Sequence, residues 1–197
     1  IPRWRRRRLQ KAWRGSPGVA VSAETTVAAV GRYYARFTAL WPTVADLAAA
    51  PLEAVLVEWA GLGYYARARN LHACAVAVVE RFGGAFPTSS EEVLTQPGIG
   101  AHTAASVSAI CADERIAVVD GNVDRVLARY IALDVPVREE KDLIRATVQA
   151  AVPERAGDFA QALMDLGATI CAPRQASCLL CPLEPACVGA KLNPLLY

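Results

Sequence analysis

The feature that most constrains this chain is a cysteine cluster near its C-terminus. Four of its six cysteines fall within seventeen residues, with the spacing C-x6-C-x2-C-x5-C. They are Cys171, Cys178, Cys181 and Cys187. Four free thiols this close together would be prone to oxidation, so we expect them to converge on a shared partner.

Three kinds of partner suit four clustered cysteines. Disulfides are not expected, because the sequence begins Ile-Pro-Arg-Trp-Arg and has no secretory signal there. Four-cysteine zinc sites usually combine two close pairs, whereas this loop has one C-x2-C flanked by wider gaps. A [4Fe–4S] cluster takes one cysteine per iron and accepts such a spacing. On coordination chemistry alone, zinc and iron–sulfur fit equally well.

The remaining cysteines, Cys74 and Cys111, each stand alone in an apolar stretch. Isolated cysteines in such surroundings usually behave as small buried hydrophobic residues. We therefore predict that both fill the core and bind nothing.

Helical periodicity dominates the chain from residue 43 onward, and its breakers mark the helix ends. Pro51 divides the first helical stretch, Gly83 and Gly84 end the second, and Ser89 with Glu92 forms a capping box that opens a short helix. The expected helices cover residues 43–61, 66–82, 101–112, 122–133, 139–152 and 158–171. Only residues 116–119, Ile-Ala-Val-Val, indicate a strand, so the predicted fold class is all-α.

Charge is unevenly distributed along the chain. The net charge is only +2, yet residues 1–14 carry six arginines and one lysine without an acid. Such an arm either contacts phosphate or is a solvated terminus, and the sequence favours neither. The longest apolar run, residues 73–79, is far shorter than the roughly 20 residues that cross a bilayer. A cytoplasmic protein is the default expectation.

A glycine-rich turn joins two predicted helices. In Pro97-Gly98-Ile99-Gly100, the two glycines let the backbone turn with its amide groups facing outward. The helix that begins after Gly100 adds the positive end of its dipole, and together these groups suit a DNA phosphate. Taken alone, such a sequence is more often a plain turn.

An aspartate follows this turn by twenty residues. Asp120 precedes a predicted helix in the stretch Val119-Asp120-Gly121-Asn122-Val123. An isolated aspartate there is usually a helix cap. A third motif, residues 61–69, sets Tyr64 and Tyr65 beside two arginines, a combination that suits insertion into stacked bases and contact with phosphates. Its alternative is a basic amphipathic helix start with packed tyrosines.

Together these motifs resemble the helix-hairpin-helix DNA glycosylases that carry an iron–sulfur cluster. The cysteine spacing is similar to the cluster loop of the endonuclease III and MutY glycosylases, which favours [4Fe–4S] over zinc. Residues 61–71 and 158–168 are most similar to the adenine-removing, MutY-type branch. The resemblance implies two helical lobes with DNA between them: residues 1–42 with 134–197 carrying the cluster, and residues 43–133 carrying the hairpin.

The resemblance also implies roles for individual residues. Asp120 would lie beside the flipped-out nucleotide and stabilise, or capture covalently, the positive charge that develops on the sugar. The implied partner is double-stranded DNA with a mismatched or damaged base, bound by a monomer at the nucleoid. The implied DNA-contacting residues are Tyr64, Tyr65, Arg67, Arg69, Pro97, Gly98, Ile99, Gly100, Arg125 and Arg174.

The chain departs from the family pattern at the catalytic acid. MutY-type enzymes use a glutamate in W-L-S-E-x-M-L-Q-Q to protonate adenine, and the matching position here is Val19. Residues 1–23 contain no acid, so Glu24 is the first candidate for this role. Losing a general acid costs about 10² to 10⁴ in rate. A catalytically silent DNA-binding iron–sulfur protein, a glycosylase for thymine or uracil, and a zinc-stapled interaction module therefore remain alternatives.

A second departure concerns strand cleavage. His102 occupies the hairpin position where bifunctional relatives carry a lysine, and histidine forms no comparable Schiff base. A monofunctional adenine glycosylase is therefore expected. His102 would contact the sugar or Asp120, or face solvent. The family's separate 8-oxoguanine-recognition domain has no counterpart in this sequence.

Overall fold

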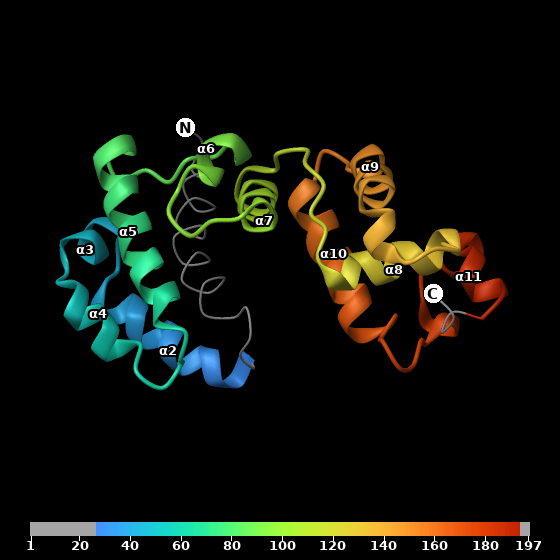
Figure 1. Cartoon of the computed structure of the whole chain (residues 1–197), viewed down its shortest axis with the longest axis horizontal. Helices are drawn as coiled ribbons and strands as arrows, with labels where there is room; N and C mark the ends of the chain where they lie inside the picture. Colours follow the sequence, from blue (N-terminus) through green and yellow to red (C-terminus); the bar gives the residue numbers. More distant parts are fainter. Residues whose placement is uncertain (1–26, 194–197) are drawn as a thin grey trace. The chain divides into compact units, whose positions relative to one another are not determined.

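The computed structural model describes residues 27–193, with side-chain positions from residue 33 onward, and the regular elements of this part of the chain are helices joined by loops (Figure 1). No strand forms in this part of the chain, so the all-α prediction is confirmed. The helices are α2 (Val27–Leu40), α3 (Val44–Ala49), α4 (Leu52–Glu58), α5 (Tyr65–Phe82), α6 (Ser90–Leu94), α7 (Ala101–Ala112), α8 (Gly121–Ile131), α9 (Lys141–Ala151), α10 (Ala156–Thr169) and α11 (Val188–Lys191). Short 3₁₀ turns cover Val137–Glu139, Cys178–Leu180 and Glu184–Ala186.

The helix breakers act where the sequence predicts. Pro51 separates α3 from α4 and stands at the N-cap of α4, where a missing backbone N–H costs nothing. Gly83 ends α5 in the left-handed conformation, with φ of 59°. The Ser89 hydroxyl accepts a hydrogen bond from the Glu92 amide at 3.3 Å, which caps α6. These boundaries confirm the predicted order of helices.

The predicted strand at residues 116–119 is wrong. Its apolar character reflects burial, since Ala117 and Val118 are both buried in an extended connection between α7 and α8. A side chain of α9 takes the place of a partner strand. The amide of Ala117 donates to Gln149 Oε1 at 2.8 Å, and Gln149 Nε2 donates to the carbonyl of Arg115 at 2.9 Å.

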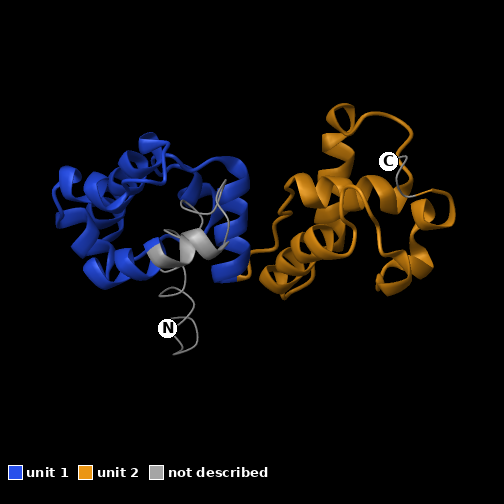
Figure 2. Ribbon diagram, turned by 90° about the horizontal axis from the view of Figure 1, so that it is seen from below, with its two compact units in different colours: residues 1–112 blue, residues 113–197 orange. Residues whose placement is uncertain are grey.

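The chain forms two compact units, residues 1–112 and 113–197 (Figure 2). In the first unit, Trp59 is fully buried between α2 and α5, and Phe37 meets it edge to face at 5.7 Å between ring centroids. Leu47 and Val55 are buried in the same core. Cys74 is buried in the same core, and the partly buried Cys111 packs against it, as predicted for filler residues.

The second unit is organised around α8, which packs against α9, α10 and α11. Val123, Val126 and Leu127 form its buried face. Two glycines allow neighbouring helices to approach α8 closely. A Cβ on Gly167 of α10 would lie 2.7 Å from Asn122 Cβ, and one on Gly189 of α11 would collide with the carbonyl oxygen of Arg129.

The boundary between the two units falls after residue 112, whereas the predicted lobes change at residues 42 and 133. The second half of α2 packs with α4 and α5, because Phe37 belongs to the Trp59 core. The predicted pairing of residues 1–42 with 134–197 depends largely on residues 1–26, which lie outside the described residues, and it stays a prediction. No helix in the described part of the chain is long and apolar enough to cross a membrane.

Candidate functional site

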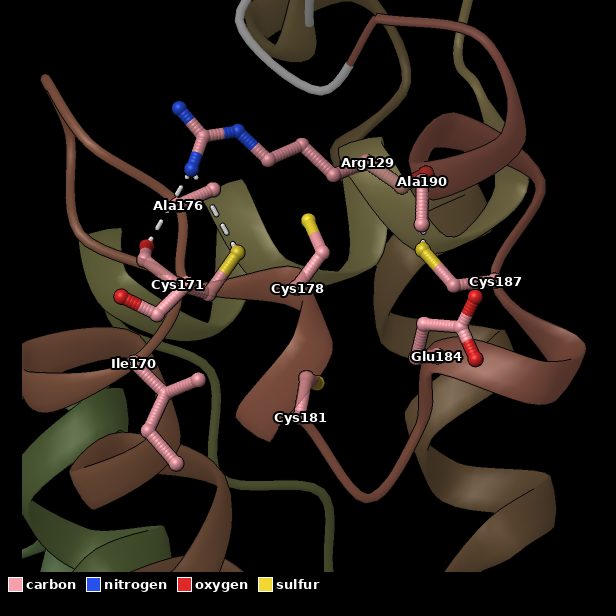
Figure 3. Close-up of a pocket in the computed structure, with 10 residues that line it drawn as sticks. Arg129, Ile170, Cys171, Ala176, Cys178, Cys181, Glu184, Cys187 and Ala190 are labelled. Atoms are coloured by element: carbon pink, nitrogen blue, oxygen red, sulfur yellow. Dashed lines mark hydrogen bonds between the residues drawn. The ribbon is translucent and has the colours of Figure 1, made fainter.

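The four clustered cysteines line one cavity in the second unit. Cys171 follows α10, Cys178 and Cys181 flank a 3₁₀ turn, and Cys187 precedes α11. Figure 3 shows their side chains around a common cavity. The volume of this cavity is about 300 Å³ when the space open to solvent is included. Residues spread over seventeen positions of sequence thus line one cavity, and their role as metal ligands stays a prediction.

The four thiols influence one another electrostatically. Burial, and after it the negative charge of the other three cysteines, raises the pKa of the Cys178 thiol. The positive charge of Arg129 acts in the opposite direction and lowers that pKa. Arg129 thus lines the same cavity as the four thiols.

Four thiols form the ligand set of both zinc and iron–sulfur sites. Among the described residues, no three His, Cys, Asp or Glu side chains stand close enough to hold one metal ion. A tetrahedral zinc ion requires all four sulfurs within about 2.3 Å of the metal. A [4Fe–4S] cluster binds each cysteine at a different iron and so holds the sulfurs farther apart. Four thiols around one cavity are a donor set that an iron–sulfur cluster can use.

Asp120 lies at the N-cap of α8, as predicted, with both carboxylate oxygens engaged. Oδ1 accepts a hydrogen bond from the Val123 amide at 2.8 Å, and Oδ2 accepts one from Asn122 Nδ2 at 3.1 Å. The partly buried side chain is thereby held in one orientation at the positive end of the helix dipole. Capping explains its conformation and also pre-orients a carboxylate for chemistry.

Arg125 connects this aspartate to the cysteine cavity. Its Nη2 donates to Asn122 Oδ1 at 2.9 Å and to the carbonyl of Gly167 at 2.6 Å, and its Nε donates to the carbonyl of Cys171 at 3.0 Å. A continuous path of hydrogen bonds therefore runs from Asp120 through Asn122 and Arg125 to the first cysteine. The predicted contact of Arg125 with DNA stays a prediction, since these bonds engage much of its guanidinium.

The predicted hairpin is present between α6 and α7. Gly98 has φ of 74°, a conformation that glycine adopts without strain. Ile99 donates its amide to the carbonyl of Gln96 at 3.2 Å, and the partly buried Ile99 side chain packs against the core. Gly100 is exposed at the start of α7. The turn therefore presents its glycines outward while Ile99 anchors it.

The hairpin is also locked against α5. A Cβ on Gly98 would lie 2.8 Å from Cγ and Nδ2 of Asn70, well inside normal contact. Asn70 follows the tyrosine–arginine motif in sequence. This contact joins two of the predicted DNA-contacting segments within one unit, although the sequence did not single out Asn70.

His102 is exposed on the first turn of α7. Ser106 Oγ lies 3.5 Å from its Nε2 and donates to its backbone carbonyl at 2.8 Å. Its predicted contact with the sugar or with Asp120 stays a prediction. No lysine stands at this position.

The tyrosine–arginine motif lies in a firmly held loop. Trp59 Nε1 donates to the carbonyl of Gly63 at 2.9 Å, and the Tyr33 hydroxyl donates to the carbonyl of Ala60 at 3.1 Å. Tyr64 itself has φ of 45° and is 69% exposed. An exposed aromatic side chain in a left-handed backbone conformation is uncommon and indicates a functional constraint.

The two arginines of this motif differ in accessibility. Arg69 is exposed on α5, whereas the guanidinium of Arg67 lies 5.8 Å from the centre of the buried Trp59 ring. Arg67 Nη2 is buried and meets no hydrogen-bond partner among the described residues. Arg69 and the exposed Arg174 are thus accessible to a DNA phosphate. Arg67 instead packs on Trp59, whose indole holds the loop.

Two predictions concern residues that the structure does not describe. Glu24, the candidate acid, and the basic residues 1–14 both lie outside residues 27–193. Conversely, the structure shows two residues in contact with the site that the sequence did not identify as functional, Asn122 and Arg129. Asn122 bonds to the nearby side chains of Asp120 and Arg125. The partners of Arg129 are backbone carbonyls and a thiol distant in sequence, which leave no spacing pattern.

Comparison with known proteins gives consistent matches over most of the chain. Adenine DNA glycosylase of Homo sapiens is 43% identical over 168 residues, which is 83% of this chain and 31% of that protein. Adenine DNA glycosylase of Mycolicibacterium smegmatis is 36% identical over 183 residues, 92% of this chain and 62% of that protein. The chain thus spans less than two thirds of the length of these relatives.

Solved structures with the same fold include two kinds of DNA glycosylase. A thermostable thymine-DNA glycosylase is similar with a TM-score of 0.81 and 27% identity, covering 95% of this chain and 87% of that one. A non-covalent endonuclease III–DNA complex is similar with a TM-score of 0.72 and 26% identity, covering 89% and 82%. The family model of the HhH-GPD superfamily base excision DNA repair proteins matches residues 18–153. Because this match covers more than half of the sequence, and the hairpin and Asp120 lie within it, the chain belongs to the HhH-GPD superfamily of base excision DNA repair proteins.

Proposed function

We propose that the chain is a monofunctional adenine DNA glycosylase acting on adenine mispaired with 8-oxoguanine or guanine. The observation that carries this proposal is the setting of Asp120, whose carboxylate is fixed at the N-terminus of α8 by Val123 and Asn122. The human and mycobacterial relatives named adenine DNA glycosylase support the choice of base.

The proposed chemistry is hydrolysis of the N-glycosidic bond. As the bond between C1′ of the sugar and N9 of adenine breaks, positive charge develops on the sugar. Asp120 stabilises that charge or captures the sugar carbon, and a water oxygen ends on C1′. The leaving adenine gains a proton, for which Glu24 is the candidate donor, and the proton that the attacking water loses returns to the Glu24 carboxylate. A Glu24→Gln variant with unchanged rate would exclude that assignment.

DNA is held chiefly through its phosphates in this proposal. The exposed glycines of the Gly98–Gly100 turn, the N-terminus of α7 and the exposed Arg69 and Arg174 supply the contacts. Tyr64 and Tyr65, exposed by 69% and 44%, are placed to insert between bases. Affinity should fall steeply with rising salt, because each neutralised phosphate releases a counterion.

The absence of strand cleavage follows from His102. A β-lyase reaction needs an amine that forms a Schiff base with the sugar, and histidine supplies none. The proposed product is therefore an intact strand with an abasic site, formed by a monomer acting on nucleoid DNA. Cleavage of the strand without added alkali would contradict this part of the proposal.

The proposed cofactor is a [4Fe–4S] cluster held by Cys171, Cys178, Cys181 and Cys187. When bound, such a cluster links the cysteine loop through four iron–sulfur bonds and adds negative charge beside Arg129. Protein purified without oxygen should be brown and contain about four irons per chain. A colourless protein with stoichiometric zinc would overturn the assignment.

One experiment separates the candidate activities. Duplexes containing A·8-oxoG, A·G, T·G and U·G pairs are incubated with the protein, and the released base is identified by chromatography. Adenine from the first two duplexes alone supports the proposal. Thymine or uracil release would favour the second candidate, a pyrimidine glycosylase, which the similarity to a thymine-DNA glycosylase structure makes worth testing. Binding without release of any base would indicate a silent DNA-binding protein.

A further inference from the structure

Arg129 is a charged side chain buried against the cysteine cavity. It is 3% exposed and lies on the last turns of α8, although buried arginines are rare unless their donors are satisfied. Its guanidinium reaches the loop that follows α10 (Figure 3). Nη1 donates to the carbonyls of Cys171 at 3.2 Å and Ala172 at 2.9 Å, and Nη2 donates to the carbonyl of Pro173 at 3.1 Å.

The same side chain also contacts sulfur. Arg129 Nη1 lies 3.4 Å from Cys171 Sγ, within hydrogen-bond distance of a thiolate. The guanidinium therefore reaches both the backbone carbonyl and the sulfur of Cys171. Hydrogen bonds to the sulfurs also influence the reduction potential of a cluster.

The backbone of Arg129 contacts the opposite end of the loop. The Cys187 thiol lies 3.6 Å from the carbonyl oxygen of Arg129, in donating geometry. Gly189, two residues later, packs so closely on this carbonyl group that a Cβ there would lie 3.1 Å from its carbon. One residue therefore touches the first and the last of the four cysteines.

We propose that Arg129 is the positioning residue of the metal-binding loop. Its side chain fixes the segment that begins at Cys171, through three hydrogen bonds to backbone carbonyls and a contact with Cys171 Sγ. The inference rests on the metal-holding role proposed above for the four cysteines. Because a guanidinium presents its donors as a rigid planar fork, lysine cannot replace the three carbonyl contacts.

The test compares Arg129→Lys and Arg129→Met with wild-type protein. Arg138→Met is the matched control, since it removes a charge from the same unit at a side chain that is 81% exposed. Metal content is measured after anaerobic purification, and metal loss is followed in excess chelator. Outer-shell substitutions typically weaken metal binding about 10- to 100-fold. We expect metal loss about tenfold or more faster in both Arg129 variants and unchanged in the control.

Two further readouts identify the cause. Hydrogen exchange should be faster at the amides of Cys171 and Ser177, which bond to Leu166 and Ile170 at 2.8 and 2.9 Å. The reduction potential of the cluster should fall, most of all in Arg129→Met, because the donor to sulfur and its charge are both lost. Circular dichroism verifies that the variants remain helical. If Arg129→Met fails to fold, metal loss from Arg129→Lys alone tests the proposal.

Several outcomes would overturn the inference. The first is that Arg129→Lys retains metal as well as the wild-type protein and shows wild-type hydrogen exchange at residues 171–177. Equal metal loss in the Arg138→Met control is another. Wild-type protein that binds no metal would overturn it together with the proposed cofactor. Adenine release is measured separately, and its absence in wild-type protein would overturn only the proposed activity.

Discussion

At the scale of single residues, the carboxylate of Asp120 combines two roles. It caps α8 by accepting a hydrogen bond from the Val123 amide, and it accepts a second one from Asn122. The two bonds restrict rotation of the carboxylate group. Helix capping alone accounts for such a residue in most proteins. The resemblance in spacing between the hairpin and this aspartate, and the connection to Cys171 through Arg125, distinguish this one.

The hairpin glycines provide a matched pair of substitutions. Gly98→Ala should lower the free energy of unfolding by about 1–3 kcal/mol, because φ of 74° disfavours alanine and Asn70 occupies the space of its Cβ. Gly100→Ala is the control, since a Cβ there would meet no atom within 4 Å and the φ of Gly100 is not positive. Chemical denaturation followed by circular dichroism measures both. Equal stability of the two variants would contradict the described hairpin.

Cys74 gives the first unit a measurable pH dependence. Burial raises the pKa of its thiol from 9.0 to about 11. Between these values the unfolded thiol ionises while the folded one stays protonated, so stability present below pH 9 is lost as the pH rises. Wild-type protein should lose up to about 1.4 kcal/mol per pH unit more than Cys74→Ala over this window. Parallel stability profiles for the two proteins would show that the thiol is not buried.

Sequence reasoning located residues that follow a spacing rule. The four cysteines, the Gly98 turn and the N-cap position of Asp120 lie where the spacing predicts, because short-range geometry determines each of them. Arg129 and Asn70 could not be found in this way. Their contacts reach partners 28 to 44 positions away, and nothing in the local sequence encodes that distance.

At the scale of elements, breakers predicted helix ends well and apolar runs predicted strands poorly. Pro51 and Gly83 act through their own backbones, so their effect is independent of the surrounding fold. Residues 116–119 are apolar because the chain buries them, and burial alone does not supply a partner strand. The partner is Gln149, whose role depends on how α9 packs.

The crossing of α8 and α10 offers a direct test of helix packing. Gly167→Ala places a methyl group 2.7 Å from Asn122 Cβ and 2.9 Å from its carbonyl oxygen. Overpacking of this kind costs about 1–3 kcal/mol, so thermal unfolding should occur at a lower temperature. Gly121→Ala is the control at the start of α8, where an added Cβ meets nothing within 4 Å. An unaltered melting temperature for Gly167→Ala would contradict the close crossing.

At the scale of the whole molecule, the two units should respond differently to loss of the metal. The first unit has its own core around Trp59, whereas the cysteine cavity belongs entirely to the second. Chelation should therefore increase hydrogen exchange in residues 113–193 and leave the amides of α4 and α5 protected, because stability is local to each cooperative unit. Mass spectrometry of peptic fragments provides the measurement. Simultaneous loss of protection in both units would indicate a single cooperative core.

The central claim is that Asp120 is the catalytic carboxylate of an adenine glycosylase, and single-turnover release of adenine from an A·8-oxoG duplex tests it most directly. Asp120→Asn retains the shape and an acceptor oxygen for the cap, but its neutral amide cannot offset the charge on the sugar. We predict that this variant binds the duplex with nearly wild-type affinity and releases adenine at least about 10³-fold more slowly. Wild-type release rates from Asp120→Asn would contradict the account.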